Sequence, residues 1–149
     1  MAYLERPQAR IFYEEEGPSN AACLTLLNGY SRSSSDFRAL SKFMSSKGLR
    51  VLRLDNRGAG KTENADGFTV DDMVGDVLAL WDFLGIASAH LLGISYGGVL
   101  SQLLANRYTS RVRSLVLVST TSSSFFLQLD NNLSAQDPET IEKNLARYF

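Results

Sequence analysis

The stretch HLLGISYGG, residues 90–98, places Ser95 between Gly93 and Gly97 at the end of an apolar run. Glycines on both sides of the serine remove β-carbons that would clash where a strand passes closely into a helix. A serine at the start of that helix lies where amide N–H groups and the helix dipole favour developing negative charge. The pattern predicts a strand, a turn that presents Ser95 as a nucleophile, and a helix. The alternative is a glycine-rich turn in which the serine is incidental.

The rest of the chain alternates apolar runs with segments of helical periodicity, which is typical of an α/β protein. The apolar runs are nearly continuous, as in parallel strands that are covered on both faces. We therefore expect a mainly parallel, twisted sheet with helices on both faces, preceded by a strand or hairpin around residues 9–16. The expected strands are ACLTLL (22–27), LRVLRLD (49–55), SAHLLGI (88–94) and VRSLVLVS (112–119), and the expected helices lie within 35–48, 69–85 and 96–108.

Two of the expected helices carry further local signals. Thr69 and Asp72 have the spacing of a capping box, and Gly85 is placed to end the same helix. The helix within 35–48 is expected to bury one apolar face against the sheet. That face consists of Phe37, Leu40, Phe43 and Met44.

The segment LLNGYS, residues 26–31, follows the first buried strand and offers a partner for Ser95. Acyl transfer needs two N–H donors for the developing oxyanion, one of them from the residue after the nucleophile and one from a neighbouring strand-to-helix loop. The backbone N–H groups of Tyr96 and Tyr30 are the expected donors, and Gly29 lets the loop turn. The alternative is an ordinary Asn-Gly turn.

The glycine-rich loop LDNRGAGKT, residues 54–62, resembles the end of a phosphate-binding P-loop. However, the first glycine of that motif would fall on Asp55, and the segment 63–68 delays the next helix. Without that glycine and an immediate helix N-terminus there is no cradle of amides for phosphate. Nucleotide binding is therefore not expected, and Asp55 is expected to brace its own loop.

Composition limits the function classes. The chain has 149 residues, with 15 Lys and Arg against 16 Asp and Glu, so no broad basic face for nucleic acid or an anionic membrane is expected. It has one cysteine, no signal-peptide pattern at its start, and no apolar run near the ~20 residues of a membrane span. These features predict a cytoplasmic protein that acts on a small molecule, with no cofactor and no metal.

Together the three motifs resemble the α/β-hydrolase fold superfamily, in particular its serine esterase and lactonase-like group with a D-x-R-G-x-G-x-S loop. Here that loop is DNRGAGKT, with Thr62 in place of the final serine, and Asn28-Gly29 stands where the family has His-Gly. The resemblance implies that Ser95 is the catalytic nucleophile of a nucleophile elbow. Serine at this position also occurs in lactonases, C–C bond hydrolases, peptidases and cofactor-free haloperoxidases.

A serine hydroxyl needs a general base, and His90 is the only histidine. Five strand residues put it roughly 16 Å from Ser95, whereas a base must lie within about 3 Å. His90 is therefore predicted to be structural. The family's acid and histidine follow its seventh and eighth strands, and this chain is expected to end after about the sixth. Asp130 would be the catalytic acid only in a minority arrangement of this family.

We therefore expect the amino-terminal part of a longer hydrolase. Residues 1–119 would form this part of the core, and residues 120–149 would begin a lid. An uncovered apolar edge strand at 112–119 supports this interpretation, because native proteins tend to avoid such edges. Candidate pocket residues in the lid are Phe125, Phe126, Leu127 and Leu129.

The leading hypothesis is a serine hydrolase that acts on an ester or related acyl bond of a small, partly apolar substrate. Its acid and histidine would lie outside this chain, so the chain alone is expected to be nearly inactive. A second hypothesis is a non-catalytic, hydrolase-like binding protein. A third is that another chain supplies the missing strands and the histidine.

Overall fold

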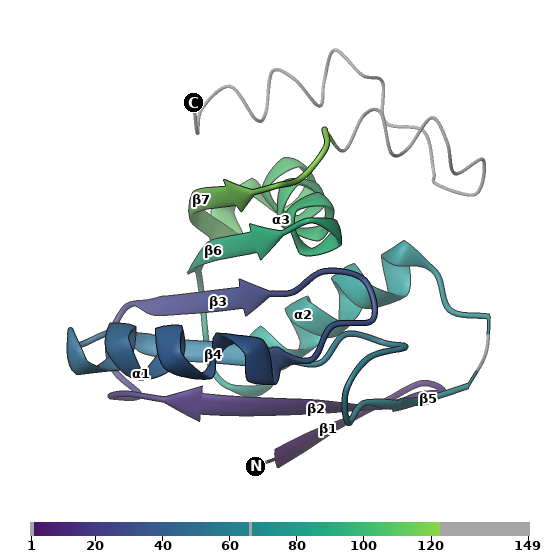
Figure 1. The fold of residues 1–149 in the computed structure, drawn as a ribbon, viewed down its shortest axis with the longest axis horizontal. Coiled ribbons are helices and arrows are strands. Elements are labelled where there is room, and N and C mark those ends of the chain that lie inside the picture. Colours follow the sequence, from purple (N-terminus) through teal and green to yellow (C-terminus); the bar gives the residue numbers. More distant parts are fainter. Residues whose placement is uncertain (1, 66, 123–149) are drawn as a thin grey trace.

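The computed structural model describes residues 2–65 and 67–122, which form one sheet with helices packed on it (Figure 1). The strands are β1 (Ala2–Arg6), β2 (Ala9–Glu16), β3 (Cys23–Leu27), β4 (Arg50–Leu54), β5 (Glu63–Asn64), β6 (Ala89–Ile94) and β7 (Val112–Val118). The α-helices are α1 (Arg38–Ser46), α2 (Val70–Phe83) and α3 (Tyr96–Arg107), and short 3-10 helices span Ser34–Phe37 and Thr109–Arg111.

The sheet is mixed and has the order β1-β2-β4-β3-β6-β7, with β5 paired to β2. Strands β4, β3, β6 and β7 run parallel, whereas β1 and β2 form an antiparallel hairpin whose second strand pairs antiparallel with β4. The predicted α/β fold, its mainly parallel sheet and its amino-terminal hairpin are confirmed. The two-residue strand β5 was not predicted, because Glu63 and Asn64 carry no apolar pattern.

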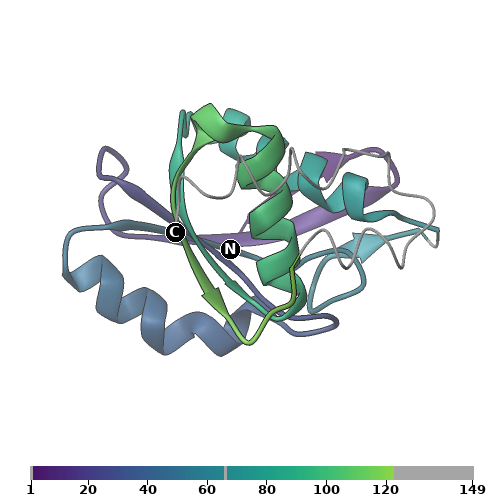
Figure 2. The ribbon, with the colours of Figure 1, turned by 90° about the horizontal axis from the view of Figure 1, so that it is seen from above.

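Helix α1 lies on one face of the sheet, and α2 and α3 lie on the other (Figure 2). The larger core fills the space beside α2 and α3, where Trp81, Leu100 and Leu103 are fully buried. A smaller cluster on the α1 side consists of Leu24, Leu26, Phe37 and Val51. Because β4, β3, β6 and β7 are parallel, their carboxyl ends and the loops that follow them lie at the same edge of the sheet.

Burial of the strands follows their position in the sheet. Every residue of β3 and β4 is buried, as expected of central parallel strands. The edge strand β7 is different, because Val116 is 49% exposed and Val118 is 39% exposed. Among the described residues, the apolar strand β7 is therefore an edge strand of the sheet, as its pattern predicts.

One predicted core residue is wrong. Phe43 was expected to pack inward from α1, but its side chain is 58% exposed. Successive helix residues are about 100° apart, and the buried side of α1 is centred between Leu40 and Ser41. Phe43 falls on the opposite side of the helix from Ser41.

Buried strand β4 carries two arginines, and each is neutralised by the hairpin strand β2. Arg53 lies 2.9 Å from Glu14 and 3.0 Å from Glu16, and its side chain is 4% exposed. Arg50 donates a 2.6 Å hydrogen bond from Nε to Glu15. The run of three glutamates in β2 thus supplies counter-charges to its neighbour.

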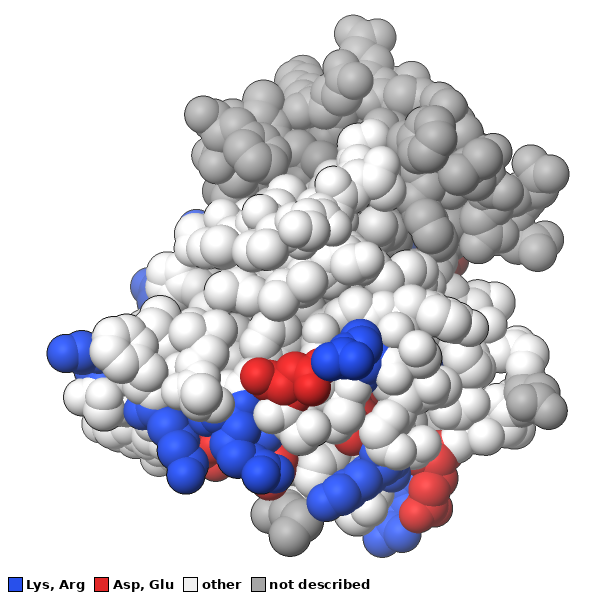
Figure 3. Space-filling view, in the orientation of Figure 1, with Lys and Arg blue, Asp and Glu red and all other residues white. Residues whose placement is uncertain are grey.

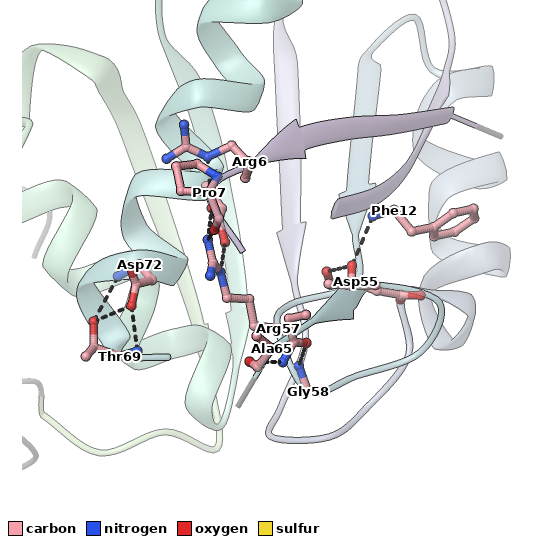
Figure 4. A network of polar contacts seen from close by, with 12 residues as sticks. Arg6, Pro7, Phe12, Asp55, Arg57, Gly58, Ala65, Thr69 and Asp72 are labelled. Atoms are coloured by element: carbon pink, nitrogen blue, oxygen red, sulfur yellow. Dashed lines mark hydrogen bonds and ion pairs between the residues drawn. The ribbon is translucent and has the colours of Figure 1, made fainter. Parts of the chain in front are cut away.

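A buried network ties the first hairpin and the glycine-rich loop to α2. Asp76 accepts hydrogen bonds from Arg57 Nε at 2.7 Å and from Arg6 Nε at 3.0 Å. Arg57 also donates to the carbonyl of Pro7 at 3.2 Å (Figure 4). The hydrogen bonds from Arg57 to Asp76 raise the pKa of the Arg57 guanidinium.

The predicted capping box at the start of α2 is present. Thr69 N–H and Thr69 Oγ1 donate to Asp72 Oδ2 at 2.7 and 2.8 Å, and Asp72 N–H donates to Thr69 Oγ1 at 3.2 Å (Figure 4). These bonds lower the pKa of the Asp72 carboxyl below its usual value.

Replacing Asp72 with alanine is expected to lower the free energy of unfolding by about 1 kcal/mol at neutral pH. Because the folded-state pKa of Asp72 is depressed, this stabilisation is complete above the unfolded-state pKa of about 3.9 and is lost as pH falls through the folded-state value. Urea denaturation of both proteins across this range measures it. A difference that stays constant well below pH ~4 would contradict the charge-based explanation.

No helix in the described residues combines the length and the apolar character that crossing a membrane requires.

Candidate functional site

Ser95 occupies a strained turn between β6 and α3. Its backbone has φ 52° and ψ −119°, and its side chain makes no capping hydrogen bond to the helix that it precedes. A non-glycine residue in such a conformation costs roughly 1–3 kcal/mol and is a feature of functional sites. Ser31 and Ser119, after β3 and β7, also have positive φ values of 55° and 48°. Three strained serines thus follow neighbouring strands at the carboxyl edge of the sheet.

The glycines around Ser95 are required by close backbone approach. A β-carbon at Gly93 would overlap the carbonyl oxygen of Gly97, and one at Gly97 would overlap the carbonyl oxygens of Leu27 and Asn28. The strand, the helix and the loop after β3 therefore meet without intervening side chains. This contact brings the segment 28–30 beside the turn that carries Ser95.

The end of β7 holds the same turn from its other side. Ser95 N–H donates to the carbonyl of Val118 at 2.9 Å, and Thr120 Oγ1 donates to the carbonyl of Ser95 at 2.7 Å. A β-carbon at Gly98 would lie 2.5 Å from the Thr120 side chain. Sequence reasoning missed Thr120, because its contact spans 25 residues and no local motif marks it.

The loop after β3 is organised by Asn28. Its Nδ2 donates to the carbonyl of Ser33 at 2.7 Å and to Asp36 Oδ2 at 2.9 Å, and its Oδ1 accepts from Gly29 N–H at 2.8 Å. An asparagine thus serves both as donor and as acceptor where the hydrolase pattern has histidine. The N–H of Gly29 is thus already hydrogen-bonded within its own loop.

Tyr30 and Tyr96, the two residues predicted to supply oxyanion donors, lie side by side. Their rings are 5.9 Å apart in an edge-to-face arrangement with an interplanar angle of 77°. A β-carbon at Gly29 would lie 3.5 Å from Ser95 Cβ, so the loop and the serine are in contact range. Among the described residues, Tyr30 N–H donates no hydrogen bond to a backbone carbonyl. The structure therefore brings Ser95, Tyr96, Gly29 and Tyr30 together.

Asp55 braces the glycine-rich loop, as expected. Its fully buried carboxylate accepts from Ser34 N–H at 2.5 Å and from Lys61 N–H at 2.7 Å. Thr62 Oγ1 donates to the Asp55 carbonyl at 2.6 Å and accepts from Phe12 N–H at 3.0 Å (Figure 4). The loop thus links the first hairpin to the segment that follows Tyr30, and Thr62 fulfils a positioning role with its hydroxyl.

His90 belongs to the opposite end of β6. Its Nδ1 lies 2.7 Å from Ser114 Oγ on β7. Burial, and then the charge of Arg113, lower the pKa of the imidazole. His90 pairs with Leu24 and Ser114 in the sheet register, whereas Ser95 follows the last residue of the strand. This placement agrees with a structural role.

The described residues contain neither a base beside Ser95 nor a metal-binding cluster. No group of three or more His, Cys, Asp or Glu side chains in residues 2–65 and 67–122 is arranged to hold a metal ion. One cavity, lined in part by Cys23, Arg50 and Arg113, lies at the amino ends of the strands, away from Ser95. Asp130 and the candidate lid residues Phe125, Phe126, Leu127 and Leu129 lie outside the described residues.

A mainly parallel sheet covered on both faces, with a strained serine between strand and helix and a backbone loop beside it, is the arrangement of an α/β protein of the hydrolase class. The chain belongs to the alpha/beta hydrolase fold family, whose family model matches residues 23–148.

Relatives of known name support this membership over part of their length. BpoC of Mycobacterium tuberculosis, named as a candidate non-heme bromoperoxidase, is 45% identical over 73 residues, or 49% of this chain and 28% of that protein. The bifunctional esterase/perhydrolase DCH of Acinetobacter calcoaceticus is 37% identical over 89 residues, or 59% of this chain and 32% of that protein. The chain thus spans less than half the length of these relatives.

A solved structure is also similar to this chain over part of its own length. The enol-lactonase from Burkholderia xenovorans LB400 matches with a TM-score of 0.75 and 34% identity, over 79% of this chain and 46% of that enzyme. The predicted recognition, including the restriction to an amino-terminal portion, is therefore confirmed.

Proposed function

We propose that this chain contributes the nucleophile and the oxyanion hole of a serine hydrolase that cleaves an ester or related acyl bond of a small, partly apolar substrate. The observation that carries the proposal is the positive φ of Ser95 at the junction of β6 and α3. Strain of this kind persists where the surrounding structure enforces it, here through Gly93, Gly97 and Thr120.

The proposed chemistry is acyl transfer in two steps. Ser95 Oγ attacks the carbonyl carbon while the general base accepts the hydroxyl proton, and the tetrahedral oxyanion accepts hydrogen bonds from the N–H groups of Tyr30 and Tyr96. Collapse of this intermediate expels the alcohol, which takes that proton from the base, and leaves an acyl ester on Ser95. Water, deprotonated by the same base, then hydrolyses this ester to the acid and free serine. Gly29, Gly93 and Gly97 support this arrangement by allowing the close approach of three backbone segments.

The general base and its carboxylate partner are proposed to lie outside residues 1–149, in a carboxy-terminal portion or a complementing chain. The coverage of relatives supports this, since residues of this chain match only 28–32% of BpoC and DCH. Removing the base of a serine protease costs about 10⁶-fold in rate and leaves roughly 10³–10⁴-fold over water. The chain alone is accordingly proposed to be a very slow esterase.

The names of the relatives support a proposed class of substrate and a second candidate activity. An esterase/perhydrolase and an enol-lactonase both favour a carboxylic ester. The name of BpoC favours a cofactor-free haloperoxidase as the second candidate. Both candidates use the same serine, so the first experiment addresses the serine itself.

We expect a fluorophosphonate to label Ser95 slowly in the 149-residue chain and faster when imidazole is added, because imidazole can replace the absent base. Intact mass and peptide mapping would measure the rate and the position. The Ser95→Ala protein should not be labelled, with or without imidazole. Ser46→Ala, at an exposed serine of α1, is the matched control. Labelling that survives in Ser95→Ala would refute the proposal.

A further inference from the structure

The side of α1 that points away from the sheet has an unusual composition. Six residues of this helix and its end are exposed, and we call them the outer face of α1. They are Arg38, Ala39, Lys42, Phe43, Ser46 and Lys47. At about 100° per residue they form one continuous surface along the helix. It contains three cations, one aromatic ring and no acidic residue.

The three cations of the outer face are not neutralised by the protein. None of them forms an ion pair among the described residues. The nearby glutamates of β2 are already paired, since Glu14 and Glu16 contact Arg53. Figure 3 shows several Lys and Arg side chains on this side of the molecule, with acidic side chains of neighbouring segments beside them. The near-zero net charge of the whole chain is therefore compatible with a small basic surface on α1.

Phe43 stands in the middle of this surface. Its side chain is 58% exposed, and the small residues Ala39 and Ser46 lie on the same side of the helix. Lys47 Nζ lies 5.4 Å from the centre of the Phe43 ring. An exposed phenylalanine on its own needs no explanation. Here the ring lies among three cations, which gives the outer face of α1 both an apolar and an electrostatic means of binding a membrane surface.

We propose that the outer face of α1 binds an anionic phospholipid surface. Arg38, Lys42 and Lys47 contact lipid phosphates, and the Phe43 ring inserts between the headgroups. Each Lys or Arg near such a surface adds to the attraction, and a partly inserted ring adds an apolar contribution. The exposed Phe43 ring favours a membrane over a purely electrostatic acidic partner, because a ring can insert between headgroups. This proposal does not depend on the role of Ser95.

A tryptophan at position 43 gives a direct readout. Trp81 is the chain's only tryptophan and is fully buried, so its emission should be insensitive to vesicles. Emission of the Phe43→Trp protein should shift to the blue with vesicles of phosphatidylcholine and phosphatidylglycerol, but not with phosphatidylcholine alone. No shift with the anionic vesicles, or equal shifts with both, would overturn the proposal.

Cosedimentation with the same vesicles tests the charges. The Lys42→Glu/Lys47→Glu protein should bind at least about thirtyfold more weakly, and added salt should weaken binding of the unchanged chain. Arg113→Glu changes an exposed charge on β7 and is the matched control. An equal loss in the control would overturn the proposal. So would binding to heparin that matches vesicle binding and is unaffected by Phe43→Ala, because it would indicate an acidic macromolecule instead.

Discussion

Replacing Asp76 with alanine is expected to lower the free energy of unfolding by about 3–5 kcal/mol. The Asp76 side chain is 2% exposed and lies within hydrogen-bond distance of two arginines. Its removal leaves the guanidinium of Arg57, which is 4% exposed, buried without a counter-charge. It also detaches β1 from α2, because Arg6 holds the hairpin to this helix through Asp76.

Urea denaturation would measure the loss, and two further variants identify its cause. Asp82→Ala removes an acid of the same helix, but its partner Arg111 is a surface contact and Asp82 is 66% exposed, so the expected loss is below about 1 kcal/mol. Combining Asp76→Ala with Arg57→Met should recover part of the stability, because it removes the uncompensated charge. A loss for Asp76→Ala no larger than that for Asp82→Ala would contradict the prediction.

The sheet could be predicted because the strands are apolar and locally bounded. In β3 and β6 the apolar runs end at glycine-containing turns, and the helices between strands carry clear 3.6-residue patterns. Apolar strands that alternate with amphipathic helices leave few alternatives to a parallel sheet with crossover helices. Burial at both faces of β3 and β4 then follows from their central position.

Charged residues in strands could not be placed from the sequence. Arg50 and Arg53 interrupt an apolar run, and their partners on β2 are more than 30 residues away. Only the sheet register, which pairs Glu14 with Arg53, brings them together. The inward prediction for Phe43 failed because the buried side of α1 includes Ser41, a polar residue whose burial the apolar pattern does not reveal.

The candidate site was accessible to sequence reasoning because its central residues lie in short motifs at the ends of strands. Ser95, Tyr30 and the glycines are each encoded within a few residues of a strand end. The supporting contacts are long-range: Thr120 reaches Ser95 from β7, and Asp55 reaches Ser34 from the loop after β4. Such partners become visible only once the topology is known.

Replacing Gly97 with alanine is expected to destabilise the fold by about 3 kcal/mol or more and to slow labelling of Ser95 by roughly 10²-fold. The added β-carbon would overlap the carbonyl oxygens of Leu27 and Asn28. Backbone atoms of a buried strand cannot move away as the end of a flexible side chain can. The loss of stability from overpacking should therefore lie at the upper end of its usual range. The displaced loop carries Tyr30, whose N–H is the proposed second oxyanion donor.

The matched control is Gly75→Ala, which adds the same methyl group inside another helix. There the nearest atom is Nη2 of Arg6 at 3.4 Å, an ordinary contact with the end of a flexible side chain. Alanine is a better helix former than glycine by up to about 1 kcal/mol, so this variant should be as stable as the parent or more so. Fluorophosphonate labelling, corrected for the folded fraction measured in urea, separates lost stability from a displaced oxyanion loop. If Gly97→Ala were labelled at the rate of Gly75→Ala, the close approach of α3 to the loop after β3 would have no part in the reactivity of Ser95.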